Sequence, residues 1–166
     1  MAKKQKVASI DFQTGIGTII PATQESFREG FDAQTRKEEK ESLITFRQTL
    51  GEKLDTQLSK DDQFPTDREV FVNIIQNFVA QKEYARRDID NMAKTILDVF
   101  KGRFYRDDSQ VKTLLVSKRM DGRIPINFAY VAVTEVKDSK DVEAIKVSGL
   151  ERSVTYYHEL RSQGKI

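Results

Sequence analysis

One short run organises this chain: Arg86-Arg87-Asp88-Ile89-Asp90-Asn91-Met92-Ala93-Lys94. Apolar residues at helical spacing begin inside it and continue beyond it, and they are Ile89, Met92, Ala93, Ile96, Leu97 and Phe100. This spacing predicts an amphipathic helix from about Asp88 to Lys101 that places its apolar side on the core. Asp90, Lys94 and Lys101 then lie together along one flank of the helix.

The spacing of the acidic residues suggests how they could meet. Asp88 and Asp90 would diverge on a regular helix, so a shared metal requires Asp88 to precede the helix as its N-cap. From Asp90 to Lys101 the helix rises about 17 Å, and the seven extended residues to Asp108 reach up to about 24 Å. Because Gly102 permits a reversal, we expect Asp108 to return beside Asp88 and Asp90.

The composition restricts the chemistry of such a site. The chain has no cysteine and one histidine, His158. Oxygen ligands therefore have to hold any metal, which favours Mg²⁺, with Mn²⁺ as the alternative. We expect Asp88, Asp90 and Asp108 to be the metal ligands of a phosphodiester-cleaving enzyme, with Lys94 offsetting charge on a phosphoryl oxygen or orienting the water.

The segment around these acids is basic. Residues 82 to 123 contain 11 Lys and Arg against 7 Asp and Glu, although the whole chain carries a formal charge of only +2. A surface of this kind attracts polyanions. The residues that we expect to bind DNA phosphates are Arg86, Arg87, Lys101, Lys118 and Arg119.

The rest of the chain predicts an α+β fold in a single domain. Its sheet is mixed or antiparallel, with two inserted helices and a C-terminal helical tail. The expected helices other than that of residues 88–101 span Thr35–Ser59, with a capping box at Thr35 and Glu38, and Leu150–Arg161. The expected strands are a strand or short hairpin within residues 5–22, then 68–80, 110–119 and 127–136. Residues 1–140 form the expected main domain and residues 141–166 its helical extension. No apolar run is long enough for a membrane span, so we expect a soluble cytoplasmic protein.

Simpler interpretations of the same residues stay open. Asp88 can be only a helix cap, Asp90 and Lys94 only a surface pair, and residues 107–109 an ordinary turn. The chain would then bind DNA without cutting it, with Phe104 and Tyr105 either stacking on bases or packing in the protein. A third possibility is a protein-interaction module that uses the predicted helix at Thr35–Ser59 or the one at Leu150–Arg161.

Over residues 86 to 119 the sequence resembles RusA-type Holliday junction resolvases. The matching positions are Asp88-Ile89-Asp90-Asn91, then Lys94, then Asp107-Asp108-Ser109-Gln110-Val111, with Tyr105 near the family's aromatic position. Outside this window the Pro-rich opening of the family is reduced to Ile20-Pro21, and the helix and tail are longer than usual.

The resemblance implies a homodimeric, magnesium-dependent endonuclease of bacterial or phage origin. Such an enzyme cuts four-way DNA junctions with paired nicks, one from each subunit. The family's essential acids fall on Asp88, Asp90 and Asp108, its functional lysine on Lys94 and its arginine on Arg87. Asp107 also matches a family position, and we expect it to support Asp108 or a metal-bound water. Nucleases for other branched DNA remain the alternative.

Overall fold

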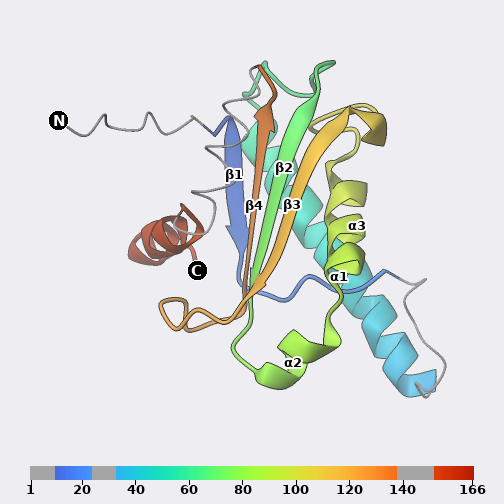
Figure 1. The fold of residues 1–166 in the computed structure, drawn as a ribbon, viewed down its shortest axis with the longest axis vertical. Coiled ribbons are helices and arrows are strands. Elements are labelled where there is room, and N and C mark those ends of the chain that lie inside the picture. Colours follow the sequence, from blue (N-terminus) through green and yellow to red (C-terminus); the bar gives the residue numbers. More distant parts are fainter. Residues whose placement is uncertain (1–9, 24–32, 138–151) are drawn as a thin grey trace.

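The computed structural model describes residues 10–23, 33–137 and 152–166. Within these residues the fold is built on a four-stranded sheet in the order β1-β4-β2-β3 (Figure 1). The strands are β1 Phe12–Ile16, β2 Val70–Asn77, β3 Val111–Arg119 and β4 Phe128–Glu135. β4 pairs antiparallel with both β1 and β2, whereas β2 and β3 run parallel. The predicted α+β class with a mixed sheet is confirmed, and the N-terminal segment contributes one strand to it.

In the described residues, three α-helices connect the strands and one more follows them. They are α1 Ala33–Leu58, α2 Gln81–Arg86 and α3 Ile89–Phe100, followed by helical residues 152–162. The predicted capping box at Thr35 is wrong, because α1 already includes Ala33. Sequence reasoning missed α2, which has six residues and none of them buried, so no apolar stripe marks it.

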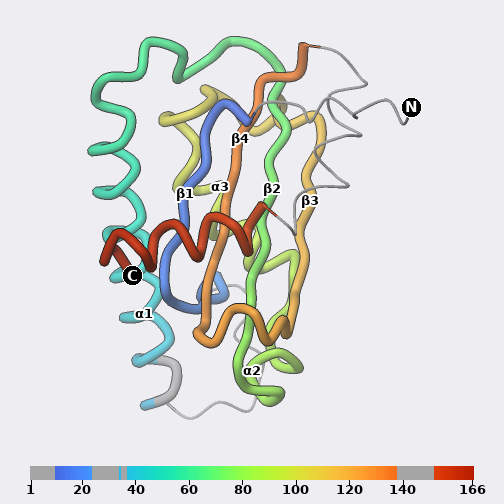
Figure 2. Tube along the Cα trace, turned by 90° about the vertical axis from the view of Figure 1, so that its left-hand side faces the viewer, coloured from blue at the N-terminus to red at the C-terminus, as the bar shows by residue number. Residues whose placement is uncertain are grey.

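The two faces of the sheet are covered by different helices. Alternate side chains of β2 point to opposite faces. Ile74 belongs to a core cluster with residues of α1 and α3, among them Leu50 and Met92. Ile75 belongs to a second cluster with Tyr157 of the C-terminal helix. Figures 1 and 2 show this helix on the face opposite to α1 and α3.

The parallel pair of strands fixes the direction of α3. A crossover helix between two parallel neighbours has to run back along them. The residues that precede α3 therefore lie at the carboxyl ends of β2 and β3, and those that follow it lie at the amino ends. α3 has 12 residues, so these two ends are about 18 Å apart. In the described ranges, no helix is long and apolar enough to cross a bilayer.

Gly15 lies in close contact with a residue of the second core cluster. A Cβ atom on Gly15 would lie 2.4 Å from Cζ of Phe128, whose ring packs on Tyr157. We expect Gly15→Ala to lower the free energy of unfolding by about 1–3 kcal/mol, because the buried ring has to move. Gly122→Ala is the matched control, since no atom lies within 4 Å of the added carbon. Urea unfolding of both variants tests this, and equal stability of the two would contradict it.

Candidate active site

Asp88 and Asp90 lie at the amino end of α3. Asp88 is the N-cap residue with an extended backbone (φ −90°, ψ 132°), as the sequence predicts, but its side chain makes no capping hydrogen bond. Asp90 lies in the first turn, and both residues are exposed. The interpretation of Asp88 as only a helix cap therefore loses its physical basis, since capping requires that hydrogen bond.

Asp107 and Asp108 lie at the other end of the same helix. The Nζ atom of Lys101, the residue directly after α3, is 3.5 Å from Oδ1 of Asp107 and 3.9 Å from Oδ2 of Asp108. The expectation that one chain brings Asp108 beside Asp88 and Asp90 is therefore wrong. Consistently, the described part of the chain contains no group of three or more acidic or histidine side chains able to hold a metal.

Buried aromatic residues explain why the segment after α3 does not return along the helix. Phe104 and Tyr105 are both 0% exposed. The ring of Phe104 packs 4.7 Å from that of Phe100, and the hydroxyl of Tyr105 donates to the carbonyl of Leu97 at 3.2 Å. Burial raises the pKa of Tyr105, so the hydroxyl keeps its proton and remains a donor. The alternative in which Phe104 and Tyr105 stack on bases is wrong, because neither ring reaches solvent.

Gln110 holds the turn that carries the two acids. Its Oε1 atom accepts hydrogen bonds from the backbone of Arg106 (2.8 Å) and Asp107 (3.0 Å). Its Nε2 atom donates to the carbonyls of Thr66 (2.8 Å) and Arg68 (2.9 Å), just before β2. One side chain therefore satisfies four backbone groups and fixes the turn at the amino ends of β2 and β3.

The two neighbouring acids have different surroundings. Asp107 caps the short helical turn Asp108–Gln110, and its carboxylate accepts hydrogen bonds from the hydroxyl and the backbone N–H of Ser109. These bonds lower the pKa of Asp107. Asp108 is exposed, and its carboxylate forms an ion pair with Lys101. Residues 107–109 therefore form a turn directly before β3.

The two arginines before Asp88 pair with glutamates. The side chain of Arg87 is only 13% exposed and lies 3.6 Å from Glu39 of α1 and 3.4 Å from Glu83 of α2. Arg86 also contacts Glu39, at 3.4 Å. Sequence reasoning missed Glu39 because nothing in its local pattern relates it to a residue 47 positions away.

The remaining predicted DNA-binding residues differ in their contacts. Lys118 donates hydrogen bonds to two backbone carbonyls, those of Tyr84 and Arg87. Lys101 lies beside the acidic turn, and Arg119 is exposed at the end of β3.

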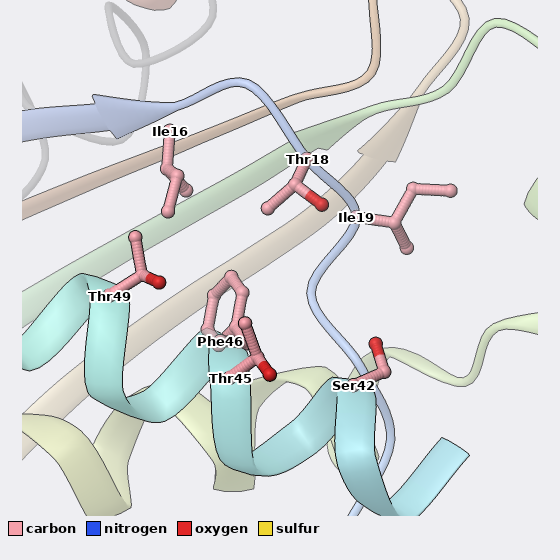
Figure 3. Close-up of a pocket in the computed structure, with 7 residues that line it drawn as sticks. All are labelled: Ile16, Thr18, Ile19, Ser42, Thr45, Phe46 and Thr49. Atoms are coloured by element: carbon pink, nitrogen blue, oxygen red, sulfur yellow. The ribbon is translucent and has the colours of Figure 1, made fainter. Parts of the chain in front are cut away.

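A cavity of about 380 Å³ lies between α1 and the chain that follows β1 (Figure 3). Its lining consists of Ile16, Thr18, Ile19, Ser42, Thr45, Phe46 and Thr49. Hydroxyl and apolar groups make up this lining, without any carboxylate or basic side chain. The cavity therefore lacks the groups that phosphate chemistry requires.

The fold and these residues define a class. The chain is an α+β domain whose crossover helix has exposed carboxylates near both ends. The sequence profile of the family described as Endodeoxyribonuclease RusA matches residues 8–128. Because this match covers more than half of the chain, the protein belongs to the RusA endodeoxyribonuclease family. Membership implies an endonuclease that acts on Holliday junctions in recombination. No curated protein matches the chain.

The hydrogen bonds of Gln110 yield a prediction. We expect Gln110→Ala to lower the free energy of unfolding by about 1–3 kcal/mol, because four backbone groups lose their partner. The loss is limited because water can replace the side chain at the exposed groups. Asp108→Asn is the control from the same turn, and we expect a change within about 0.5 kcal/mol. Chemical denaturation measures both. If Gln110→Ala changes stability no more than Asp108→Asn does, the turn does not depend on the Gln110 side chain and the prediction is wrong.

Proposed function

We propose that this protein is a magnesium-dependent endonuclease that resolves four-way junctions as a homodimer with shared sites. In each site Asp88 and Asp90 come from one subunit and Asp108 from the other. The separation of the acids by the length of α3 carries this proposal. A two-fold axis that passes beside the middle of α3, perpendicular to it, would set the helices of the two subunits antiparallel. Asp108 of the partner subunit would then lie near Asp88 and Asp90.

The character of the acids supports their role as ligands. Asp88 makes no capping hydrogen bond, and Asp88, Asp90 and Asp108 are all exposed. Carboxylate oxygens that remain accessible to water suit Mg²⁺, which binds few protein ligands and keeps several waters; Mn²⁺ accepts the same donors. When bound, such a cation supplies charge neutralisation at the phosphate and an acidified water. The carboxylate of Asp107 is engaged by Ser109, which favours Asp108 as the ligand and Asp107 as its support.

The basic residues complete the site. Lys94 lies one turn beyond Asp90 on the exposed flank of α3, where its ammonium can donate to a phosphoryl oxygen as charge develops. Lys101 and Arg119 are exposed at opposite ends of the α3–β3 unit, and Arg86 is partly exposed. We assign phosphate contacts to these three, which give affinity without reading sequence.

The dimer accounts for paired cutting. Two copies related by a two-fold axis hold two equivalent sites, which matches the symmetry of a four-way junction and the one nick per subunit implied by the family. Cleavage of other branched DNA by the same chemistry is the alternative, and a binding protein without catalysis is the second.

Junction cleavage tests the roles of the acids and the metal together. We expect paired nicks in a four-way junction with Mg²⁺ and no nicks with EDTA. A matched linear duplex should not be cut under either condition. Asp90→Asn should reduce the cleavage rate by about 10³-fold or more while junction affinity is kept, because removing a negative charge relieves repulsion of phosphate. Equal cutting of flaps or three-way junctions would support the broader nuclease. Binding without cutting by the wild type would support the non-catalytic alternative.

A mixture of two inactive variants tests whether the sites are shared. Asp90→Asn and Asp108→Asn should each be inactive alone. In a mixed dimer one site carries both changes and the other carries neither, so co-expression of the two should restore about a quarter of the wild-type sites. The restored activity should appear as single nicks. Asp88→Asn mixed with Asp90→Asn is the control, because every mixed dimer then has a damaged site on both sides. Failure of both mixtures, with dimers present, would contradict a shared site.

A further inference from the structure

The contacts of Lys118 differ from those expected of a DNA-binding side chain. It is the penultimate residue of β3, on the same face as Gln76 of β2, and is half-buried. Its Nζ atom donates to the carbonyl of Tyr84 at 2.8 Å and to that of Arg87 at 2.9 Å. The same atom lies 4.5 Å from the centroid of the Tyr84 ring. Two of its three donors are therefore used, and the aromatic face covers the ammonium further.

The two carbonyls belong to the last turn of α2 and its C-cap. The final carbonyls of a helix have no partner within the helix, and a lysine there stabilises both the carbonyls and the helix dipole. α2 has six residues and buries none of them, so it cannot hold its own conformation. Tyr84 of α2 packs on the ring of Phe78, and Lys118 adds from β3 the partners that the last carbonyls of this helix lack.

The contact between Lys118 and the Arg87 carbonyl lies one residue before the candidate site. Arg87 is followed directly by Asp88, the N-cap of α3. The side chain of Arg87 is held in turn by Glu39 of α1 and Glu83 of α2. Lys118 therefore fixes the backbone, and the two glutamates fix the side chain, of the residue next to the first acid.

We propose that Lys118 is a positioning residue for Asp88 and Asp90 and does not bind DNA phosphates. This inference rests on the proposed function for its catalytic meaning. In this proposal, Lys118 holds the Arg87 carbonyl in place and so sets the direction in which the Asp88 carboxylate points. Magnesium affinity is the property that depends on this direction, since two carboxylates have to reach one ion.

The chain offers a matched control next to Lys118. Arg119 is its neighbour on β3, has the same charge, lies on the opposite face and is exposed. Lys118→Met removes the ammonium and keeps an apolar stem over Tyr84, and Arg119→Met removes an exposed charge. Lys118→Arg tests rescue, because a guanidinium also carries donors for two carbonyls.

The experiment compares the three variants in junction binding and cleavage. We expect Lys118→Met to keep the wild-type Kd and salt dependence, to need about tenfold more Mg²⁺ for half-maximal cleavage, and to be restored largely by arginine. Arg119→Met should instead weaken binding about fivefold and reduce the salt slope by about one, with the Mg²⁺ requirement unchanged. A weaker Kd and smaller salt slope for Lys118→Met, with an unchanged Mg²⁺ requirement, would overturn the proposal.

Hydrogen exchange tests the positioning role without any cleavage. Lys118→Met should speed exchange of the backbone amides of residues 87–91 about tenfold, because the segment opens more often. Arg119→Met should leave them as in the wild type. Unchanged exchange in Lys118→Met would overturn the positioning role even if the enzyme is active. If Lys118→Met exchanges faster but the wild type does not cut junctions, the positioning role is supported and only the proposed function is contradicted.

Discussion

The length and burial of α3 constrain everything else in this molecule. Six of its residues are buried, and five of these belong to the core cluster shared with α1, β2 and β4. A helix held in this way is a rigid spacer of about 18 Å. The acids before it and the acids after it cannot approach one another by local motion. A catalytic site that needs both sets therefore has to recruit one of them from a second copy.

Polar side chains give each end of this spacer a defined geometry. At one end Gln110 binds four backbone groups around the acidic turn. At the other, Lys118 binds the carbonyls before Asp88. Both residues belong to β3 or to the turn that precedes it, so this edge strand connects the two ends of α3. A change in the packing of β3 would consequently affect the two acid sets together.

Much of this arrangement follows from the sequence, because helical and strand periodicity record local burial. The stripe of α3, the N-cap position of Asp88 and the segments of β3 and β4 are all visible in the pattern. The path of residues 101–108 is not visible. Chain length shows how far a loop can reach, but its direction depends on where Phe104 and Tyr105 are buried. Those tertiary contacts leave no periodic signal, and for the same reason Glu39 could not be connected to Arg87.

Tertiary contacts also change the distribution of charge that one segment of the sequence indicates. Residues 82–123 contain more bases than acids, but several of these bases pair with acids from distant parts of the chain. Arg103 pairs with Asp55, Arg106 with Asp67 and Lys112 with Glu69. A count confined to one segment therefore overstates the positive field that DNA meets. These pairs are largely exposed, however, and such pairs contribute little to stability. Phosphates can replace the acidic partners at small cost, whereas the buried contacts of Arg87 and Lys118 resist this exchange. Burial thus separates the bases that can exchange an acidic partner for a phosphate from Arg87 and Lys118, which keep their partners within the protein.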